Sequence, residues 1–368
     1  MSSSGYGLSH PLSGAEIPAP VVPYLPPRPK SYRPKIALIG CGGISEYHLR
    51  AYRAMALDVA MLCDRELGRA ERRRAEFYPG AVVTADYRDV LRRGDIEVVD
   101  LALHPAERVE VIDAALRVGK HVLSQKPFVL DLDVGARLAD LADAHGVQLA
   151  VNQNGRWAPH LGYLGAAVRA DVIGTVASVD CTLQWDHTWT AGTAFEAIHH
   201  LVLFDFGIHW FDLAACLLRG RPAERVWASV RRADFQSMRP PMLAHVAIDY
   251  PGAQVRLDFN GHVRHGQEDR TVVCGAHGTL RSSGPSLSEQ NVVVHTAAGR
   301  ARATLEGTWF TSGFEGAMGE LLCAIEEQRA PAHHARGNLD SLALCFAALA
   351  SADRVEPCVP GTVRRAPG

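Results

Sequence analysis

Residues 35–152 alternate short apolar runs with amphipathic stretches, and this alternation restricts the possible fold more than any other feature of the chain. Continuous apolar strands separated by amphipathic helices are typical of a parallel sheet that helices cover on both faces. The sequence therefore predicts an α/β fold that begins with a doubly wound Rossmann domain. The expected strands span 35–39, 58–64, 81–84, 97–103, 121–124 and 148–152, with helices between them.

The turn after the first strand contains Gly40, Gly42 and Gly43, followed by Ile44 and Ser45. Glycines let a backbone approach a pyrophosphate, and the following helix N-terminus offers free N–H donors and a positive dipole end. Ser45 stands where the G-x-G-x-x-G pattern has its third glycine, so the pattern needs the support of the surrounding strand and helix. We expect the cofactor to contact Gly40, Gly42, Gly43 and Ile44.

A carboxylate, Asp64, ends the second apolar strand at the distance expected for the acid that binds the ribose hydroxyls. Its charge would repel a 2′-phosphate, so the sequence favours NAD, while the neighbouring Arg65 keeps NADP as an alternative. Asp64 could also be an ordinary N-cap of the next helix. Ligands of doubly wound sheets bind at the carboxyl ends of the strands. Further cofactor contacts are therefore expected from His104, Pro105, Gln125 and Lys126.

Two separated motifs resemble a known family. The strand end Ser124-Gln125-Lys126-Pro127 is similar to a Glu-Lys-Pro segment, with Gln125 where glutamate is usual, and residues 205–212 fit the pattern D-x-G-x-H-x-x-D. In these motifs and their order, residues 35–353 resemble the glucose–fructose oxidoreductase, inositol dehydrogenase and rhizopine-catabolism (Gfo/Idh/MocA) family of NAD(P)-dependent oxidoreductases. The resemblance implies that Lys126, Asp205 and His209 form the catalytic group, and that the Lys126–Pro127 peptide can be cis.

The residues themselves also suit this chemistry. Asp205, His209 and Asp212 would share one face of a helix over 198–218 that is otherwise apolar. Alcohol oxidation removes a hydroxyl proton, and histidine titrates near the working pH, with a carboxylate to orient it and raise its basicity. Lys126 would stabilise negative charge on the substrate oxygen. The alternative is a satisfied core pair, with Asp212 holding the helix to a neighbouring loop.

Candidate substrate contacts follow the first domain. Arg156 could bind substrate oxygens or a cofactor phosphate, and Trp157 could pack beside the nicotinamide, unless both only fix the domain junction. Residues 184–189 form an aromatic and polar cluster that is either a sugar-binding wall or part of the core. Relatives often carry a glycine pair where residues 195–200 stand, so a relative's substrate does not transfer. The expected substrate-binding residues are Arg156, Trp157, Trp185, His187 and Asp212.

The second half of the chain predicts a different architecture. Successive strands without intervening helices indicate an α+β domain with a large, mainly antiparallel open sheet, closed by helices over 313–329 and 338–353. One sheet face should cover the catalytic helix, and the other should need cover from a second subunit, which predicts a homodimer or homotetramer. The expected strands span 175–185, 225–230, 242–250, 254–260, 270–274 and 292–295. The predicted divisions are a flexible or arm-like extension over 1–34, the Rossmann domain over 35–155, the α+β domain over 156–353 and a tail over 354–368.

Composition narrows the functional classes. A formal charge of -2 and a pI near 6.8 give no electrostatic case for nucleic acid or anionic membrane as a partner. Without an apolar stretch that could span a bilayer and without a signal core in residues 1–34, a cytoplasmic location is expected. Eight scattered cysteines indicate reduced thiols. Adjacent side chains point apart, so neither His199-His200 nor His333-His334 is expected to make a metal site.

Three functional hypotheses remain. The first is an NAD(P)-dependent oxidoreductase that transfers hydride between the nicotinamide and a secondary hydroxyl or ketone of a sugar, cyclitol or glycoside. The second is a glycoside-cleaving enzyme that oxidises its substrate transiently, eliminates and returns the hydride. The third is a non-catalytic nucleotide-binding sensor, which the presence of Lys126, Asp205 and His209 disfavours.

Overall fold

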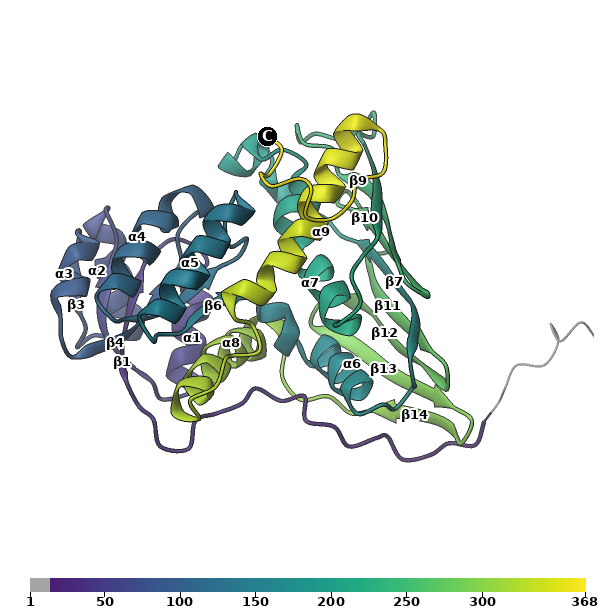
Figure 1. Cartoon of the computed structure of the whole chain (residues 1–368), viewed down its shortest axis with the longest axis horizontal. Helices are drawn as coiled ribbons and strands as arrows, with labels where there is room; N and C mark the ends of the chain where they lie inside the picture. The colour runs from purple at the N-terminus through teal and green to yellow at the C-terminus, as the bar shows by residue number, and fades with distance from the viewer. Residues whose placement is uncertain (1–13) are drawn as a thin grey trace, which may run out of the picture.

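The alternating first part of the chain forms a six-stranded parallel sheet in the order β3-β2-β1-β4-β5-β6 (Figure 1). The computed structural model describes residues 14–368. The strands are β1 (Lys35–Ile39), β2 (Asp58–Cys63), β3 (Val82–Thr84), β4 (Ile96–Leu101), β5 (His121–Gln125) and β6 (Leu149–Asn152). The helices between them are α1 (Ser45–Ala54), α2 (Leu67–Phe77), α3 (Tyr87–Arg92), α4 (Pro105–Arg117) and α5 (Leu132–Ala144).

Both faces of this sheet are buried. Ile36 and Leu38 of β1 pack in one hydrophobic cluster, whereas Ala37 and Ile39 pack in another on the opposite face. Because successive strand side chains point to opposite faces, a sheet with two buried faces needs continuous apolar strands. The predicted doubly wound domain is confirmed, and the carboxyl ends of its strands gather along one edge.

The second sheet has eight strands in the order β14-β13-β12-β11-β7-β10-β9-β8, and among its neighbouring pairs β7 and β10 are parallel while the others are antiparallel. This confirms the predicted open sheet, but two polar strands, β12 and β14, were not predicted. The strands are β7 (Val176–Gln184), β8 (Arg225–Arg231), β9 (Leu243–Tyr250), β10 (Ala253–Asn260), β11 (Glu268–Gly275), β12 (Gly278–Ser286), β13 (Glu289–Thr296) and β14 (Gly299–Ala303).

The outer face of this sheet is polar. Arg256 pairs with Asp180 at 2.5 Å and Arg225 with Asp249 at 2.7 Å, and the exposed Trp227 stands among them. Because these charged side chains are already paired, they do not by themselves require the second subunit that the sequence predicts on this face. A homodimer or homotetramer through this sheet remains a prediction, which the paired charges on its outer face do not support.

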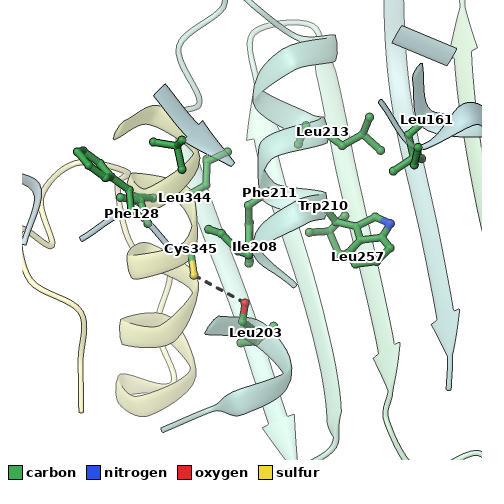
Figure 2. Packing of buried hydrophobic residues seen from close by; sticks show 14 of the residues in the cluster. Phe128, Leu161, Leu203, Ile208, Trp210, Phe211, Leu213, Leu257, Leu344 and Cys345 are labelled. Carbon is green, nitrogen blue, oxygen red and sulfur yellow. Dashed lines mark hydrogen bonds between the residues drawn. The ribbon is translucent and has the colours of Figure 1, made fainter. Parts of the chain in front are cut away.

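Helices pack on the inner face (Figure 1). A single π turn (Val202–Phe206) leads into α7 (Ile208–Leu217), which lies between the sheet and α9 (Ala335–Arg354), while α6 (Pro159–Arg169) covers β12 and β13. Figure 2 shows Ile208 and Phe211 directed toward α9, where the Cys345 thiol lies 3.8 Å from the Leu203 carbonyl oxygen. Each fully buried apolar side chain contributes about 1.5–3 kcal/mol, so this packing holds α7 firmly.

A helix from the C-terminal part of the chain packs against the first domain. Helix α8 (Trp309–Glu326), far along the chain, places Phe314 and Met318 in the same cluster as Leu49 and Tyr52 of α1. The first domain is therefore completed by a C-terminal helix, because the α1 side of the parallel sheet would otherwise remain exposed. The predicted continuous domain over 35–155 omits this helix.

The described part of the N-terminal extension is an ordered arm on its own chain. The Ile17 amide donates to the Arg300 carbonyl at 2.9 Å, which adds the arm to the edge of β14. Farther along, the Glu326 carboxylate of α8 accepts the amides of Lys30, Ser31 and Tyr32 at 2.6–2.8 Å. Of the two predicted alternatives, a flexible tail or an arm, residues 14–34 fit the arm, which lies along both domains of its own chain. Residues 1–13 lie outside the described residues.

The C-terminal tail is also bound. Cys358 exchanges two backbone hydrogen bonds of 2.8 Å with Val226 of β8, and the Leu132 amide donates to the Arg364 carbonyl. All eight cysteines are free thiols. Within residues 14–368, no helix is both long enough and apolar enough to cross a membrane.

Candidate functional site

The glycine turn has the shape that a pyrophosphate needs. At Gly40, φ is +98° and an added Cβ would lie 2.6 Å from the Ala102 carbonyl oxygen, so a larger residue does not fit. At Gly42 and Gly43 an added Cβ would meet no atom of the described chain within 4 Å, so these glycines border open space. Helix α1 follows without a side-chain cap at Ile44. The Glu46 and Tyr47 amides donate to the Gly43 and Ile44 carbonyl oxygens, so the amides just before Glu46 are the ones that can face an anion. These residues fit a dinucleotide phosphate.

Arginine 73, which sequence reasoning missed, supports this turn. Its Nε donates to the Ser45 hydroxyl at 3.1 Å, and its Nη2 donates to the Gly42 carbonyl at 3.3 Å. The Ser45 hydroxyl itself donates to the same carbonyl at 2.5 Å. The residue in the third glycine position therefore stabilises the turn through its hydroxyl, and these contacts leave the amide side of the turn free.

Asp64 lies at the end of β2, beside the turn. One carboxylate oxygen accepts the Cys41 amide and the other accepts the Glu66 amide, both at 2.8 Å. Each oxygen retains a lone pair, so Asp64 combines the turn-stabilising role with room to accept a ribose hydroxyl. The exposed Arg65 side chain pairs with Glu107 of α4. Its charge is thereby partly satisfied, which disfavours its use for a 2′-phosphate.

The other predicted cofactor residues lie at the ends of β4 and β5. His104 is exposed and immediately precedes α4, whose first residue is Pro105. Gln125 is buried, and its Oε1 accepts the Lys126 amide at 2.9 Å. The Lys126–Pro127 peptide is cis. The Gln125 side chain thus holds the strand end and positions the backbone of Lys126.

Lys126 and Asp205 meet across the two domains. The Lys126 Nζ lies 2.9 Å from the Asp205 carbonyl oxygen and 3.3 Å from its Oδ1. Both side chains are mostly buried, at 15% and 18% exposure, so the pair is shielded from solvent yet accessible at one side. Asp205 belongs to the π turn, and such turns frequently occur at functional sites.

His209 joins this pair, with a different electrostatic role from the one expected. Its ring packs edge-on against Trp309 with centroids 5.4 Å apart, and an added Cβ at Gly155 would lie 3.3 Å from its Nδ1. Burial, and then the Lys126 ammonium, hold the pKa of His209 well below its usual value. The expected ring that titrates near neutral pH was wrong, because burial lowers its pKa. The expected carboxylate that orients the ring was also wrong, because the Asp205 carboxylate faces Lys126.

Aromatic side chains form a wall next to Asp205. His187 stacks on Phe206 with ring centroids 3.9 Å apart, and Trp185 packs edge-on against His187 at 5.3 Å. Burial lowers the pKa of His187 to about 4, so this ring is neutral. Trp189, half exposed, contacts Phe206 at 6.2 Å. Trp185 and His187 therefore lie close to Phe206, the neighbour of Asp205, and their role in substrate binding remains a prediction. Trp189 belongs to the same predicted aromatic cluster, whereas Phe206 had no predicted role.

Three predicted substrate contacts lie elsewhere. The Arg156 guanidinium binds the Asp212 carboxylate through two hydrogen bonds of 2.6 and 2.7 Å, and the Ser341 hydroxyl donates to the same carboxylate at 2.8 Å. Trp157 is buried, and an added Cβ at Gly316 would lie 2.1 Å from its Cγ. These contacts occupy all three side chains, which hold α7, α8 and α9 together. The assignment of Arg156, Trp157 and Asp212 to substrate binding is withdrawn.

Beneath the site lies a buried cation that sequence reasoning also missed. Arg108 of α4 is 1% exposed, and its guanidinium is 3.5 Å from both the Ser124 hydroxyl and the Lys126 carbonyl oxygen. Burial lowers the pKa of Arg108 to about 9, and Asp205 opposes that shift. Arg108 thus adds positive potential near Asp205. A polar residue inside an amphipathic helix is ordinarily read as surface, so its sequence carried no signal.

One of the two histidine pairs also differs from expectation. Nε2 of His199 and Nε2 of His200 both lie within 3.1 Å of the Asp353 carboxylate, so the argument that adjacent histidines point apart was wrong there. The other pair does diverge: His333 is buried, whereas His334 accepts the Gly337 amide as the N-cap of α9.

Comparisons with known proteins agree with this arrangement. The family model described as an oxidoreductase family with an NAD-binding Rossmann fold matches residues 34–153, and that of the GFO/IDH/MocA C-terminal domain matches residues 163–281. The chain is 26% identical to D-apiose dehydrogenase of Paraburkholderia graminis, over 86% of this chain and 87% of that protein. It is 30% identical to an uncharacterised oxidoreductase of Schizosaccharomyces pombe, over 70% of this chain and 73% of that protein.

A solved structure shows the same fold. An oxidoreductase from Agrobacterium radiobacter, in complex with NAD+, L-tartaric acid and magnesium, superposes with a TM-score of 0.81 at 20% identity. The match covers 90% of this chain and 99% of that chain. Together with the two family matches, these similarities confirm the resemblance inferred from the motifs, and the chain belongs to the Gfo/Idh/MocA family of NAD-binding oxidoreductases.

Proposed function

We propose that this protein is an NAD-dependent dehydrogenase that acts on a secondary hydroxyl, or the corresponding ketone, of a sugar, cyclitol or glycoside. The observation that carries the proposal is the contact between Lys126 and Asp205 beside His209, at the carboxyl edge of the parallel sheet. The same edge carries the open glycine turn and Asp64. The relative named D-apiose dehydrogenase supports a carbohydrate as the substrate.

His209, Lys126 and Asp205 can each contribute to the transfer of the hydroxyl proton. NAD, when bound against the glycine turn, supplies the hydride acceptor. The neutral imidazole of His209 can accept the hydroxyl proton, and its low pKa keeps it unprotonated over the working pH range. Lys126 can donate a hydrogen bond to the substrate oxygen as negative charge develops there, and Asp205 holds the Lys126 ammonium in place.

The aromatic wall supplies the binding surface in this proposal. Stacked rings such as His187 and Phe206 offer a flat apolar face that suits the C–H face of a pyranose or cyclitol ring. Trp189 is the most exposed member and would close over the substrate. NADP remains a weaker alternative to NAD, because the Asp64 carboxylate beside the glycine turn would repel a 2′-phosphate.

The test is single-turnover hydride transfer, followed at the NADH absorbance with a panel of aldoses, cyclitols and glycosides. We expect net NADH formation with at least one polyol. His209→Gln should lower its rate by roughly a hundredfold or more, the usual scale for loss of acid–base catalysis, and leave the NADH dissociation constant nearly unchanged. His245→Gln, on the exposed outer face, is the matched control and should leave both the rate of hydride transfer and the NADH dissociation constant unchanged.

Two results would overturn the proposal. If His209→Gln transfers hydride at the parent rate, the proton leaves by another route. If substrates are cleaved without net NADH formation, the hydride returns to the substrate and the redox-neutral glycoside-cleaving hypothesis replaces this one. The pH profile adds a check: because the His209 pKa lies well below its usual value, the rate should not fall through a step near pH 6.5.

A further inference from the structure

Two adjacent histidines and an aspartate converge outside the site described above. His199 and His200 precede the π turn that carries Asp205, and Asp353 lies in the last turn of α9. The Asp353 Oδ1 is 3.0 Å from His199 Nε2 and 2.8 Å from His200 Nε2. The three candidate ligand atoms lie within 4.8 Å of one another. Side chains from two distant segments thus present three metal-ligating atoms to one point.

The backbone explains why both rings reach the same side. His200 has φ +44°, a left-handed backbone conformation that residues other than glycine rarely adopt. This kink turns the two rings together, with centroids 3.9 Å apart. The His200 carbonyl accepts the amides of Leu203 and Phe204 at 2.9 and 3.0 Å, so the start of the following helical segment fixes the kink.

The arrangement matches the demands of zinc. Ligand atoms about 2.0–2.2 Å from a tetrahedral zinc ion lie roughly 3.3–3.6 Å from one another. The Asp353 Oδ1 lies 3.0 and 2.8 Å from the two histidine Nε2 atoms, and all three ligand atoms lie within 4.8 Å of one another, so small side-chain shifts would bring them to that spacing. Two imidazoles and a carboxylate are borderline ligands that suit Zn²⁺ better than Ca²⁺ or Mg²⁺, which prefer oxygen. His200 is nearly buried, whereas His199 and Asp353 are over a third exposed, so a fourth position faces solvent.

We propose that His199, His200 and Asp353 form a zinc-binding site with water or an exogenous anion as the fourth ligand. The site would fasten the segment before the catalytic helix to the C-terminal end of α9. Its effect would reach Asp205 through the His200 carbonyl, which caps the first amides of that helical segment. The proposal stands independently of the substrate and of the redox chemistry.

The experiment measures metal binding on the full chain after chelator treatment. Equilibrium dialysis with zinc chloride should give one tight site per chain, and cobalt(II) should give the visible d–d absorption of a four-coordinate nitrogen and oxygen site. Zinc at a hundredfold excess over the dissociation constant should raise the melting temperature by about 3 °C or more. Each readout is independent of activity.

Variants separate this site from the other histidines. His199→Ala, which removes an exposed ligand and should fold normally, should weaken zinc affinity at least about tenfold, and Asp353→Asn should do the same. His245→Ala is the control, because His245 also contacts a carboxylate, that of Asp258, but no third ligand joins them among residues 14–368. The proposal is overturned if the unmodified chain shows no tight site, or if both site variants bind zinc as tightly as the control does.

Discussion

A buried carboxyl group, Asp269, should make the stability of this protein fall as the pH rises toward neutrality. Asp269 lies in β11, opposite Leu183 of β7 and Gly284 of β12, and is fully buried. Neither carboxylate oxygen has a hydrogen-bond partner among residues 14–368. Burial, and then the neighbouring Glu268, raise the pKa of Asp269 from 3.8 to about 7. The folded chain therefore keeps this group protonated where the unfolded chain ionises it.

The sign and size of the effect follow from proton linkage. Between pH 4 and 7 the folded state binds a proton that the unfolded state has released, so the free energy of unfolding decreases as the pH rises. A difference of about three pH units at about 1.4 kcal/mol each amounts to roughly 4 kcal/mol. The contribution is complete below pH 4 and is lost progressively until the folded group ionises near pH 7.

Asp269→Asn removes the titration and nearly preserves the shape of the protonated side chain. Urea unfolding at pH 5 and pH 8 should show the variant gaining roughly 3 kcal/mol of stability relative to the parent, because about two of the three pH units of the effect lie between these pH values. Asp180→Asn, on the outer face, is the control and should show no such divergence, because its partner Arg256 does not titrate in this range. If parent and Asp269→Asn change in parallel between these pH values, Asp269 is ionised in the folded protein and the reasoning fails.

Three further predictions concern the site and its supports. Gly42→Ala should leave the melting temperature unchanged, because an added Cβ would meet no atom of the described residues within 4 Å. It should weaken NADH binding at least tenfold by fluorescence titration, and unchanged binding would place the pyrophosphate elsewhere. NADH should bind more tightly than NADPH, and Asp64→Ser should narrow the difference, whereas equal affinities in the parent would remove the role of Asp64. Arg156→Leu leaves the buried Asp212 unpaired and should cost roughly 3–5 kcal/mol in urea unfolding. The surface change Arg256→Leu should cost about 1 kcal/mol or less, and equal costs would contradict the structural role of Arg156.

Local sequence pattern determined the first domain and the order of the site motifs. Apolar runs such as Lys35–Ile39 need burial on both faces, and this requirement leaves few architectures besides a parallel sheet under helices. Parallel strands then bring their carboxyl ends together, so Gly40, Asp64 and Lys126 share one edge without any knowledge of distant contacts. Strands β12 and β14 escaped prediction because they are polar and form by pairing with β11 and β13.

Only the tertiary structure decided how the charged side chains of the site are paired. The pattern that placed Asp205 and His209 four residues apart could not show that Asp205 faces Lys126, or that burial lowers the pKa of His209. The pattern also could not show that the Arg156 guanidinium binds the Asp212 carboxylate. Nor could it show that Asp353 contacts His200, which lies 153 residues earlier in the chain. The sequence by itself determined which segments bury their side chains, because burial follows local periodicity. Ion pairing and desolvation depend on neighbours that packing brings together from distant parts of the chain, so those properties were decided by the tertiary structure alone.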